Sequence, residues 1–136
     1  MRAIDRWRAL QPRQQRLTCA AAIVVATAGM LLRVAGVQRV LRYAARPVTG
    51  SAIGDHEIGD RIAAIERAGR YVPGATCLAT SLALAWILRG RGVPAEIRVG
   101  VKTVDGFSAH AWVENEGKAL TPATDAGGTF TVVVSS

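Results

Sequence analysis

The two residues in this sequence best suited to covalent chemistry are Cys77 and His110. A thiol attacks a carbonyl as the thiolate, and both a helix N-terminus and a neighbouring imidazole favour that anion. Cys77 follows a Pro-Gly turn signal at 73–74 and a suitable N-cap residue, Thr76, so the sequence predicts that it begins a helix. A Cys–His pair in this setting would support nucleophilic acyl transfer from a carbonyl group.

The local pattern leaves a structural role open for both residues. A free cysteine commonly behaves as a small buried hydrophobe, and His110 could be a strand-surface histidine beside an aromatic residue. The predicted polar face of its strand also carries Trp112 and Glu114, so His110 need not be buried. The second histidine, His56, lies in a polar segment that suits solvent better.

A third residue would orient the imidazole, as a carboxylate does in other catalytic triads. Asp125 is the nearest carboxylate in the segment that follows the hairpin, and Glu114 and Glu116 lie on the hairpin and its turn. We expect Asp125 to take this role. The backbone N–H of Cys77 is the natural donor to an oxyanion, and no side-chain donor stands out.

The cysteines and histidines show no metal-ligand spacing, and no glycine pattern indicates a nucleotide site. We therefore expect neither a metal nor a cofactor.

The elements that must position these residues are helices followed by an antiparallel β-meander, which is an α+β fold. Helical periodicity predicts helices at 3–10, 12–29, 58–70 and 78–89, and the stretch 31–45 either continues the helix at 12–29 or forms a second helix. After Pro94 the period changes to two, which predicts strands at 95–101 and 107–114, and further strands at 119–121 and 129–134. A nucleophile-bearing helix packed on this sheet would bring Cys77 to His110.

Composition and charge leave the choice of partner open. Half of the 136 residues are hydrophobic and the net charge is +7, with nine arginines in the first 46 residues opposed only by Asp5. This basic region is either a solvated face or a surface for nucleic acid, anionic lipid or an acidic peptide. Two cysteines in contrasting settings do not indicate a disulfide scaffold, so we expect a reducing, cytoplasmic compartment.

The stretch Leu17 to Leu32 is the one feature that suggests a membrane. It is shorter than the roughly 20 apolar residues that a spanning helix needs, and Arg33 closes it. We expect a helix packed on the domain or on a partner, with peripheral membrane contact and a signal peptide as the alternatives.

Four blocks in order carry a resemblance to a known family. They are CLATSLAL at 77–84, LRGRGVPA at 88–95, IRVGV at 97–101 and FSAHAWVE at 107–114. Together they resemble the leader peptidase of lasso-peptide biosynthesis, a transglutaminase-like cysteine protease family, over about residues 58–121. The resemblance implies a small papain/transglutaminase-like domain at 58–136, preceded by a basic helical region at 1–57 that docks a partner.

The resemblance also implies a function. The enzyme would be a peptide hydrolase of ribosomal-peptide antibiotic biosynthesis that cuts a lasso precursor between leader and core, with Cys77 as nucleophile and His110 as base. Residues 1–57 look too apolar for a fused leader-recognition domain, which implies the split form with a separate recognition protein. An ATP-dependent lasso cyclase would use the freed amine, and no nucleic acid partner is implied.

One departure from the family affects the third residue. The acidic residue of the family usually follows the histidine by about a dozen positions, where this sequence has Pro122. Asp125 serves only if the loop shifts; otherwise Thr121 or a backbone carbonyl would orient His110. Two other readings remain: an idle transglutaminase-like scaffold that holds precursor, recognition protein and cyclase together, and a basic protein that binds lipid or nucleic acid.

Overall fold

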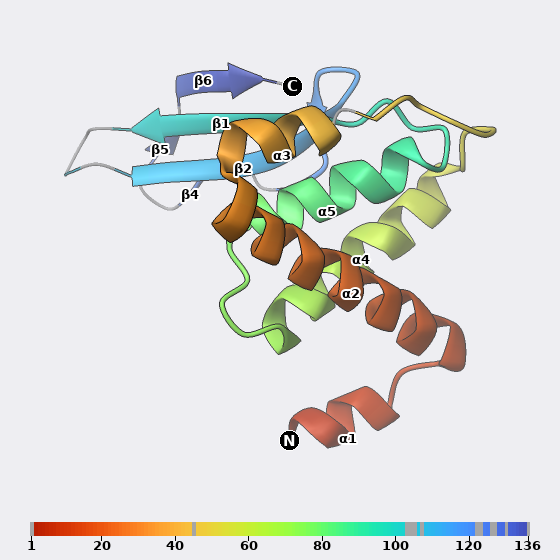
Figure 1. Ribbon diagram of the computed structural model, residues 1–136. Coiled ribbons are helices and arrows are strands. Elements are labelled where there is room, and N and C mark those ends of the chain that lie inside the picture. Colours follow the sequence, from red (N-terminus) through yellow and green to blue (C-terminus); the bar gives the residue numbers. More distant parts are fainter. Residues whose placement is uncertain are drawn as a thin grey trace.

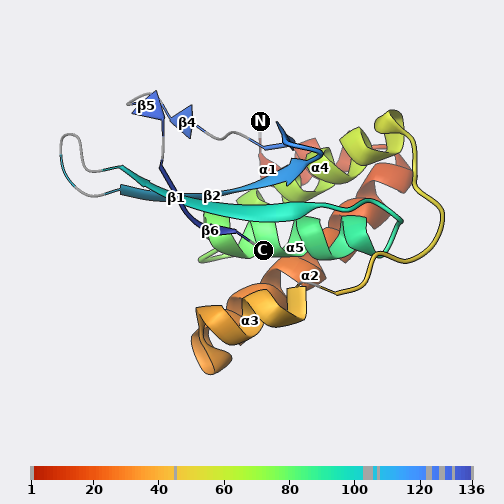
Figure 2. The same cartoon turned by 90° about the horizontal axis from the view of Figure 1, so that it is seen from above.

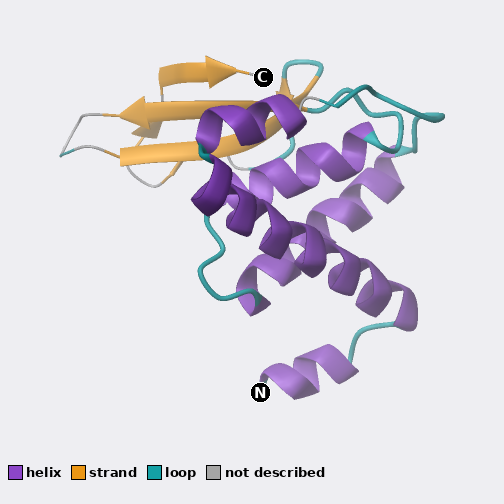
Figure 3. Ribbon diagram, viewed as in Figure 1, coloured by secondary structure: helices purple, strands orange, loops and turns teal. Residues whose placement is uncertain are grey.

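Helices cover one face of an antiparallel sheet in the computed structural model, which describes residues 2–44, 46–102, 106, 108–121, 124–125, 128–129 and 131–135 (Figure 1). The helices are α1 (Ala3–Arg8), α2 (Pro12–Ala35), α3 (Val37–Ala44), α4 (Asp55–Tyr71) and α5 (Cys77–Arg89). The strands are β1 (Glu96–Lys102), β2 (Ser108–Asn115), β3 (Lys118–Ala119), β4 (Thr124–Asp125), β5 (Gly128–Thr129) and β6 (Thr131–Ser135). The predicted α+β class is confirmed, with α5 packed against β1 and β2 (Figure 3).

The order of the main sheet is β3-β2-β1-β6, and β4 pairs separately with β5. All pairs in the main sheet are antiparallel, and Gly100 of β1 lies opposite His110 of β2. The expected meander is wrong in one respect, because β6 pairs with the far edge of β1 instead of following β3. The seven residues of β1 offer a longer edge for backbone hydrogen bonds than the two residues of β3.

The core lies between α5, the neighbouring helices and the sheet (Figure 2). The largest fully buried apolar side chains include Leu82, Leu84 and Leu88 of α5, together with Ile97 and Val113 of the sheet. Burying a side chain of this size stabilises the fold by roughly 1.5–3 kcal/mol. Helix α5 is therefore held from both sides, which fixes the position of its first residue, Cys77.

Helix α2 also contributes to this core, through a face that includes Ala21 and Val25. Two polar contacts tie it to α4: an ion pair between Arg13 and Asp60, and a hydrogen bond of 2.9 Å that Arg67 Nε donates to Thr18 Oγ1. One cluster of buried residues thus includes members from both sides of position 57. The division into 1–57 and 58–136 stays a prediction.

The sequence left open whether 31–45 continues the second helix or forms another one: α2 runs past Gly29 to Ala35, and α3 begins at Val37 after Gly36, whose φ is 84°. A glycine inside a helix costs only about 1 kcal/mol relative to alanine, and the flanking residues are good helix formers. Helix α2 has 24 residues and contains an 18-residue stretch with a mean hydropathy of 2.0, so by length and composition it is long and apolar enough to cross a membrane. The core helix of a soluble protein and a signal sequence have the same properties, and the inner face of α2 packs on α4 and α5.

Candidate active site

Cys77 is the first residue of α5, and its side chain is exposed. The preceding residue, Thr76, is extended and caps the helix: its Oγ1 accepts a hydrogen bond of 3.1 Å from the backbone N–H of Ala79. This confirms the predicted N-cap. The hydroxyl of Thr80 donates to the carbonyl oxygens of Thr76 and Cys77, both at 3.1 Å, and so closes the first turn. The thiol is therefore presented from a well-ordered helix start, where the helix dipole favours an anion.

His110 lies on β2, half-buried and next to an aromatic ring. The imidazole and the indole of Trp112 are nearly parallel, at 21°, with ring centroids 6.1 Å apart. Across the strand pair lies Gly100, which has no side chain to occupy the space beside the imidazole. The expectation that an indole neighbours His110 is confirmed.

The predicted polarity of the two faces of β2 is wrong at two positions. Trp112 was expected on the polar face but is only 3% exposed, whereas Ala109, on the predicted apolar face, is exposed. Trp112 can be buried on this face because its polar group has a partner. The ring is buried, and its Nε1–H donates a hydrogen bond of 3.2 Å to Glu114 Oε1.

Cys77 and His110 line the same pocket, whose volume is about 170 Å³. The other lining residues come from α4, α5, β2 and the segment after β3: Ile65, Glu66, Gly69, Thr80, Ser81, Ala111 and Thr121. The two residues expected to form the catalytic pair thus line one pocket, Cys77 from a helix and His110 from a strand, and their catalytic roles stay a prediction. Gly69 leaves room for the pocket, because a Cβ at this position would lie 3.3 Å from Thr80 Cγ2.

The candidates for the third residue, which would orient His110, lie in three different parts of the structure. The backbone of Asp125 lies in β4, and its side chain lies outside the described part of the chain, so its role stays a prediction. Thr121 lines the pocket, but its Oγ1 accepts a hydrogen bond of 3.0 Å from the backbone N–H of Val113. Glu116 is exposed in the turn between β2 and β3, at a φ of 53°.

Glu66 lines the pocket but was not predicted from the sequence. The sequence pattern that could have indicated Glu66 is the spacing on α4, which places Ile65, Glu66 and Gly69 on one side of the helix. A helical face identifies a set of neighbours, but only the packing of α4 on α5 turns that face toward Cys77.

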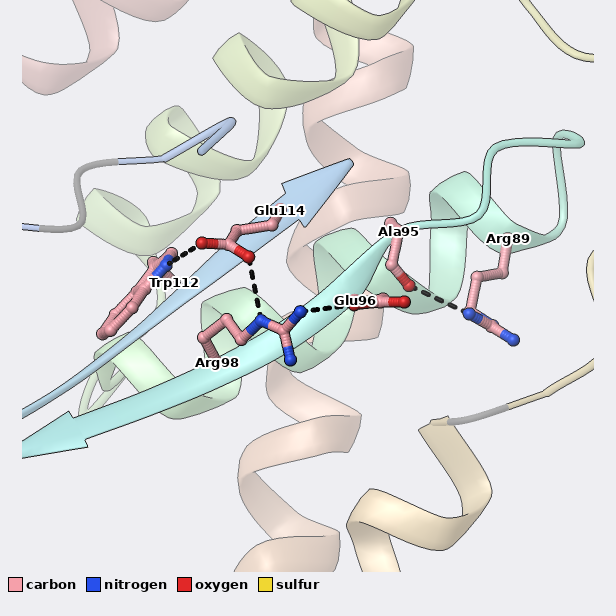
Figure 4. A network of polar contacts seen from close by, with 6 residues as sticks. All are labelled: Arg89, Ala95, Glu96, Arg98, Trp112 and Glu114. Carbon is pink, nitrogen blue, oxygen red and sulfur yellow. Dashed lines mark hydrogen bonds and ion pairs between the residues drawn. The ribbon is translucent and has the colours of Figure 1, made fainter. Parts of the chain in front are cut away.

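A polar network on β1 and β2 fixes the tryptophan beside His110 (Figure 4). Arg98 Nε donates to Glu114 Oε2 at 2.8 Å, and Arg98 Nη2 donates to Glu96 Oε2 at 2.8 Å. The hydrogen bond from Arg98, and then that from Trp112, hold the pKa of Glu114 below its usual range. Glu114 is therefore committed to this network and is a poor candidate to orient the imidazole.

Comparison with protein families matches residues 21–135 to the transglutaminase-like superfamily. The chain belongs to this superfamily. The match extends from α2 to β6 and includes both residues of the proposed pair. Comparison with curated proteins and with solved structures gave no match.

The transglutaminase-like superfamily includes cysteine proteases and transglutaminases, so a thiol and an imidazole in one pocket fit its chemistry. The first N–H groups of a helix have no partner within it, and the cap at Thr76 uses that of Ala79. This leaves the N–H of Cys77 suited to an oxyanion. Within the described part of the chain, no group of three His, Cys, Asp or Glu side chains could hold a metal ion.

Proposed function

We propose that this transglutaminase-like protein is the leader peptidase of a lasso-peptide pathway, which cuts a ribosomally made precursor between leader and core. The observation that carries the proposed peptidase activity is the shared pocket of Cys77, at the start of α5, and His110, on β2. The choice of a lasso precursor as substrate rests on the four sequence blocks that resemble this peptidase family.

In the proposed reaction, His110 takes the proton of the Cys77 thiol, and the sulfur attacks the carbonyl carbon of the last leader residue. The backbone N–H of Cys77 donates to the oxyanion of the tetrahedral intermediate. The C–N bond then breaks, and His110 gives its proton to the departing amine of the core. Water attacks the resulting thioester with His110 as base, which frees the leader carboxylate and restores the thiol.

The products define the proposed partners. A separate recognition protein would bind the leader and deliver it, with the basic region 1–57 as its docking surface. An ATP-dependent lasso cyclase would join the freed amine to an acidic side chain of the core. We propose that these steps take place in the cytoplasm, where the thiol stays reduced.

The test is cleavage of the precursor, followed by mass spectrometry, with and without the recognition protein encoded near the same gene. Wild type and Cys19→Ala should release leader and core, and Cys77→Ala should release neither. Cys19 is a matched control because both cysteines are free and exposed. If Cys77→Ala still binds the recognition protein and supports the pathway, the protein is a scaffold and the peptidase proposal fails.

A further inference from the structure

Two neighbouring cavities lie along α5 toward its C-terminal end, away from Cys77. The first, of about 380 Å³, lies between α2, α4 and the end of α5, and is lined by Arg46, Arg61 and Arg91 over an apolar floor. The second, of about 360 Å³, lies between α2, α3 and α5 and is almost entirely apolar. Both are lined by Val24 and Trp86, so they adjoin one another.

The arginines of the first cavity form no ion pair with a described acidic residue. Among the described residues, Arg61 donates only a long hydrogen bond, of 3.4 Å, to the carbonyl oxygen of Glu57. Partial burial, and then the charge of Arg91, lower the pKa of Arg61, although the charges of Glu57 and Asp60 act on Arg61 and partly offset this lowering. A cation that is partly removed from water and repelled by a neighbouring charge is stabilised when an anion binds beside it.

Arg46 is the most constrained of the three. Its guanidinium lies over the ring of Trp86, 3.8 Å from the centroid, and its buried Nε has no hydrogen-bond partner among the described residues. A Cβ at Gly90 would overlap the guanidinium, so the glycine leaves the space that Arg46 fills. Burial, and then repulsion by Arg89, lower its pKa. The side chain is thus held in place without an acceptor for Nε.

The second cavity is suited to a large apolar side chain. Its lining includes Ile23 and Leu31, which are 68% and 42% exposed, together with the buried Leu82. An exposed apolar surface of this kind beside a cluster of cations favours a ligand with both characters.

We propose that these adjoining cavities bind a short segment of a partner protein in which a carboxylate lies close in sequence to a large apolar side chain. The carboxylate would sit among Arg46, Arg61 and Arg91, and the apolar side chain would fill the cavity between α2, α3 and α5. Arginine forks bind carboxylates in a bidentate manner, and the shared wall at Val24 and Trp86 keeps the two anchors close together. The segment does not need the Cys77 pocket, so this proposal stands independently of the peptidase reaction.

The shape of the site favours a peptide over a lipid surface. A basic amphipathic face binds a bilayer with its arginines around a protruding apolar ridge. Here the cations line a concavity, and Arg46 Nε is buried against Trp86. A protruding side chain can enter such a cavity, whereas a flat surface contacts only its rim.

The test is selection from a phage-displayed library of random linear peptides on the full-length protein. The enriched sequences should combine Asp or Glu with a large apolar residue within a few positions. A labelled synthetic peptide of that sequence should bind the double variant Arg61→Glu/Arg91→Glu and the single variant Ile23→Asp at least about tenfold more weakly than it binds wild type. It should bind Arg70→Glu, an exposed position on α4 outside both cavities, as it binds wild type.

Replacing the peptide's own carboxylates by amides should have the same effect as the arginine substitutions, and this result does not depend on how any variant folds. Enriched peptides without acidic residues, or equal binding to the double variant Arg61→Glu/Arg91→Glu and to wild type, would overturn the proposal. A third arm uses phosphatidylcholine vesicles with and without phosphatidylserine. The proposal would also be overturned, in favour of a lipid site, if three results came together. No peptide is selected, the wild-type protein binds only the vesicles that contain phosphatidylserine, and the double variant Arg61→Glu/Arg91→Glu does not bind them.

Discussion

Cys77 and His110 line one pocket from two layers of the fold, the first from the start of α5 and the second from the middle of β2. The imidazole in the same pocket can take the proton of the thiol as the sulfur attacks, so Cys77 should react with iodoacetamide about tenfold faster than Cys19 at neutral pH. Exposure does not explain such a difference, because both cysteines are exposed. The measurement is peptide mass spectrometry over a time course, for wild type and His110→Gln. Equal rates for the two cysteines would contradict the active-site assignment.

The cap at Thr76 should contribute both stability and reactivity. Thr76→Ala removes the acceptor for the N–H of Ala79, and we expect the free energy of unfolding to fall by about 1 kcal/mol, with slower alkylation of Cys77. Thr76→Ser keeps the hydroxyl and should restore both properties. Thr27→Ala is a control, since that exposed hydroxyl only donates back to the carbonyl of Ile23. Urea unfolding checks the prediction, and a loss in Thr76→Ser equal to that in Thr76→Ala would disprove the capping role.

The network of Arg98, Glu114 and Trp112 should make stability depend on pH. The folded protein lowers the pKa of Glu114 from its ordinary 4.5, so the contribution is complete above the unfolded value and is lost as the pH falls through the folded value. Glu114→Gln should therefore cost about 1 kcal/mol at pH 7, and the difference from wild type should shrink under more acidic conditions.

Urea unfolding at a series of pH values from neutral to acid tests this dependence. Glu116→Gln, at an exposed turn position, should behave as wild type throughout. A difference between Glu114→Gln and wild type that stays constant over the whole range would show that the network does not titrate with folding.

Two glycines of α4 should respond in opposite ways to alanine. At Gly59 a Cβ would meet no heavy atom within 4 Å, so Gly59→Ala should stabilise the protein by about 0.5–1 kcal/mol. At Gly69 the new methyl group would press on Thr80 at the pocket. Gly69→Ala should therefore not stabilise the protein as Gly59→Ala does, and it should change the alkylation rate of Cys77. Thermal melts and labelling rates check both. Identical effects of the two substitutions would mean that α4 does not pack closely on α5 beside the pocket.

Gly92 should be far less tolerant of alanine than Gly117. Both have a φ of 78°, and a positive φ of this size costs an L-residue about 1–2 kcal/mol. At Gly92 the Cβ would also overlap backbone, 2.6 Å from the nitrogen of Ala52, whereas a Cβ at Gly117 would meet no heavy atom within 4 Å. Gly92→Ala should therefore reduce the free energy of unfolding clearly more than Gly117→Ala. Similar losses would place the strain in the backbone angle alone.

The sequence predicted the local features of the site well, because these depend on nearby residues. Thr76 as a cap and Cys77 at a helix start follow from the turn before them, and the buried Ile97 follows from the alternation in β1. The approach of His110 to Cys77 required the packing of α5 on the sheet, and the resemblance to a known family made that expectation specific.

Features that depend on packing between distant segments were missed. The partner of β6 depends on which strand edge is free, and no pattern within β6 encodes it. The place of Glu66 at the pocket depends on the rotation of α4 against α5, and the burial of Trp112 depends on Glu114 accepting its N–H. For Asp125, the prediction concerns a side chain outside the described residues.

The pairing of β6 with β1 has a consequence for how the protein is synthesised. Strand β1 is made well before β6, the last described strand, so one edge of the sheet stays open while the ribosome completes the chain. Exposed strand edges of this kind promote association between nascent or shortened chains. We therefore expect a truncated protein that ends before β6 to aggregate, even though it contains both Cys77 and His110.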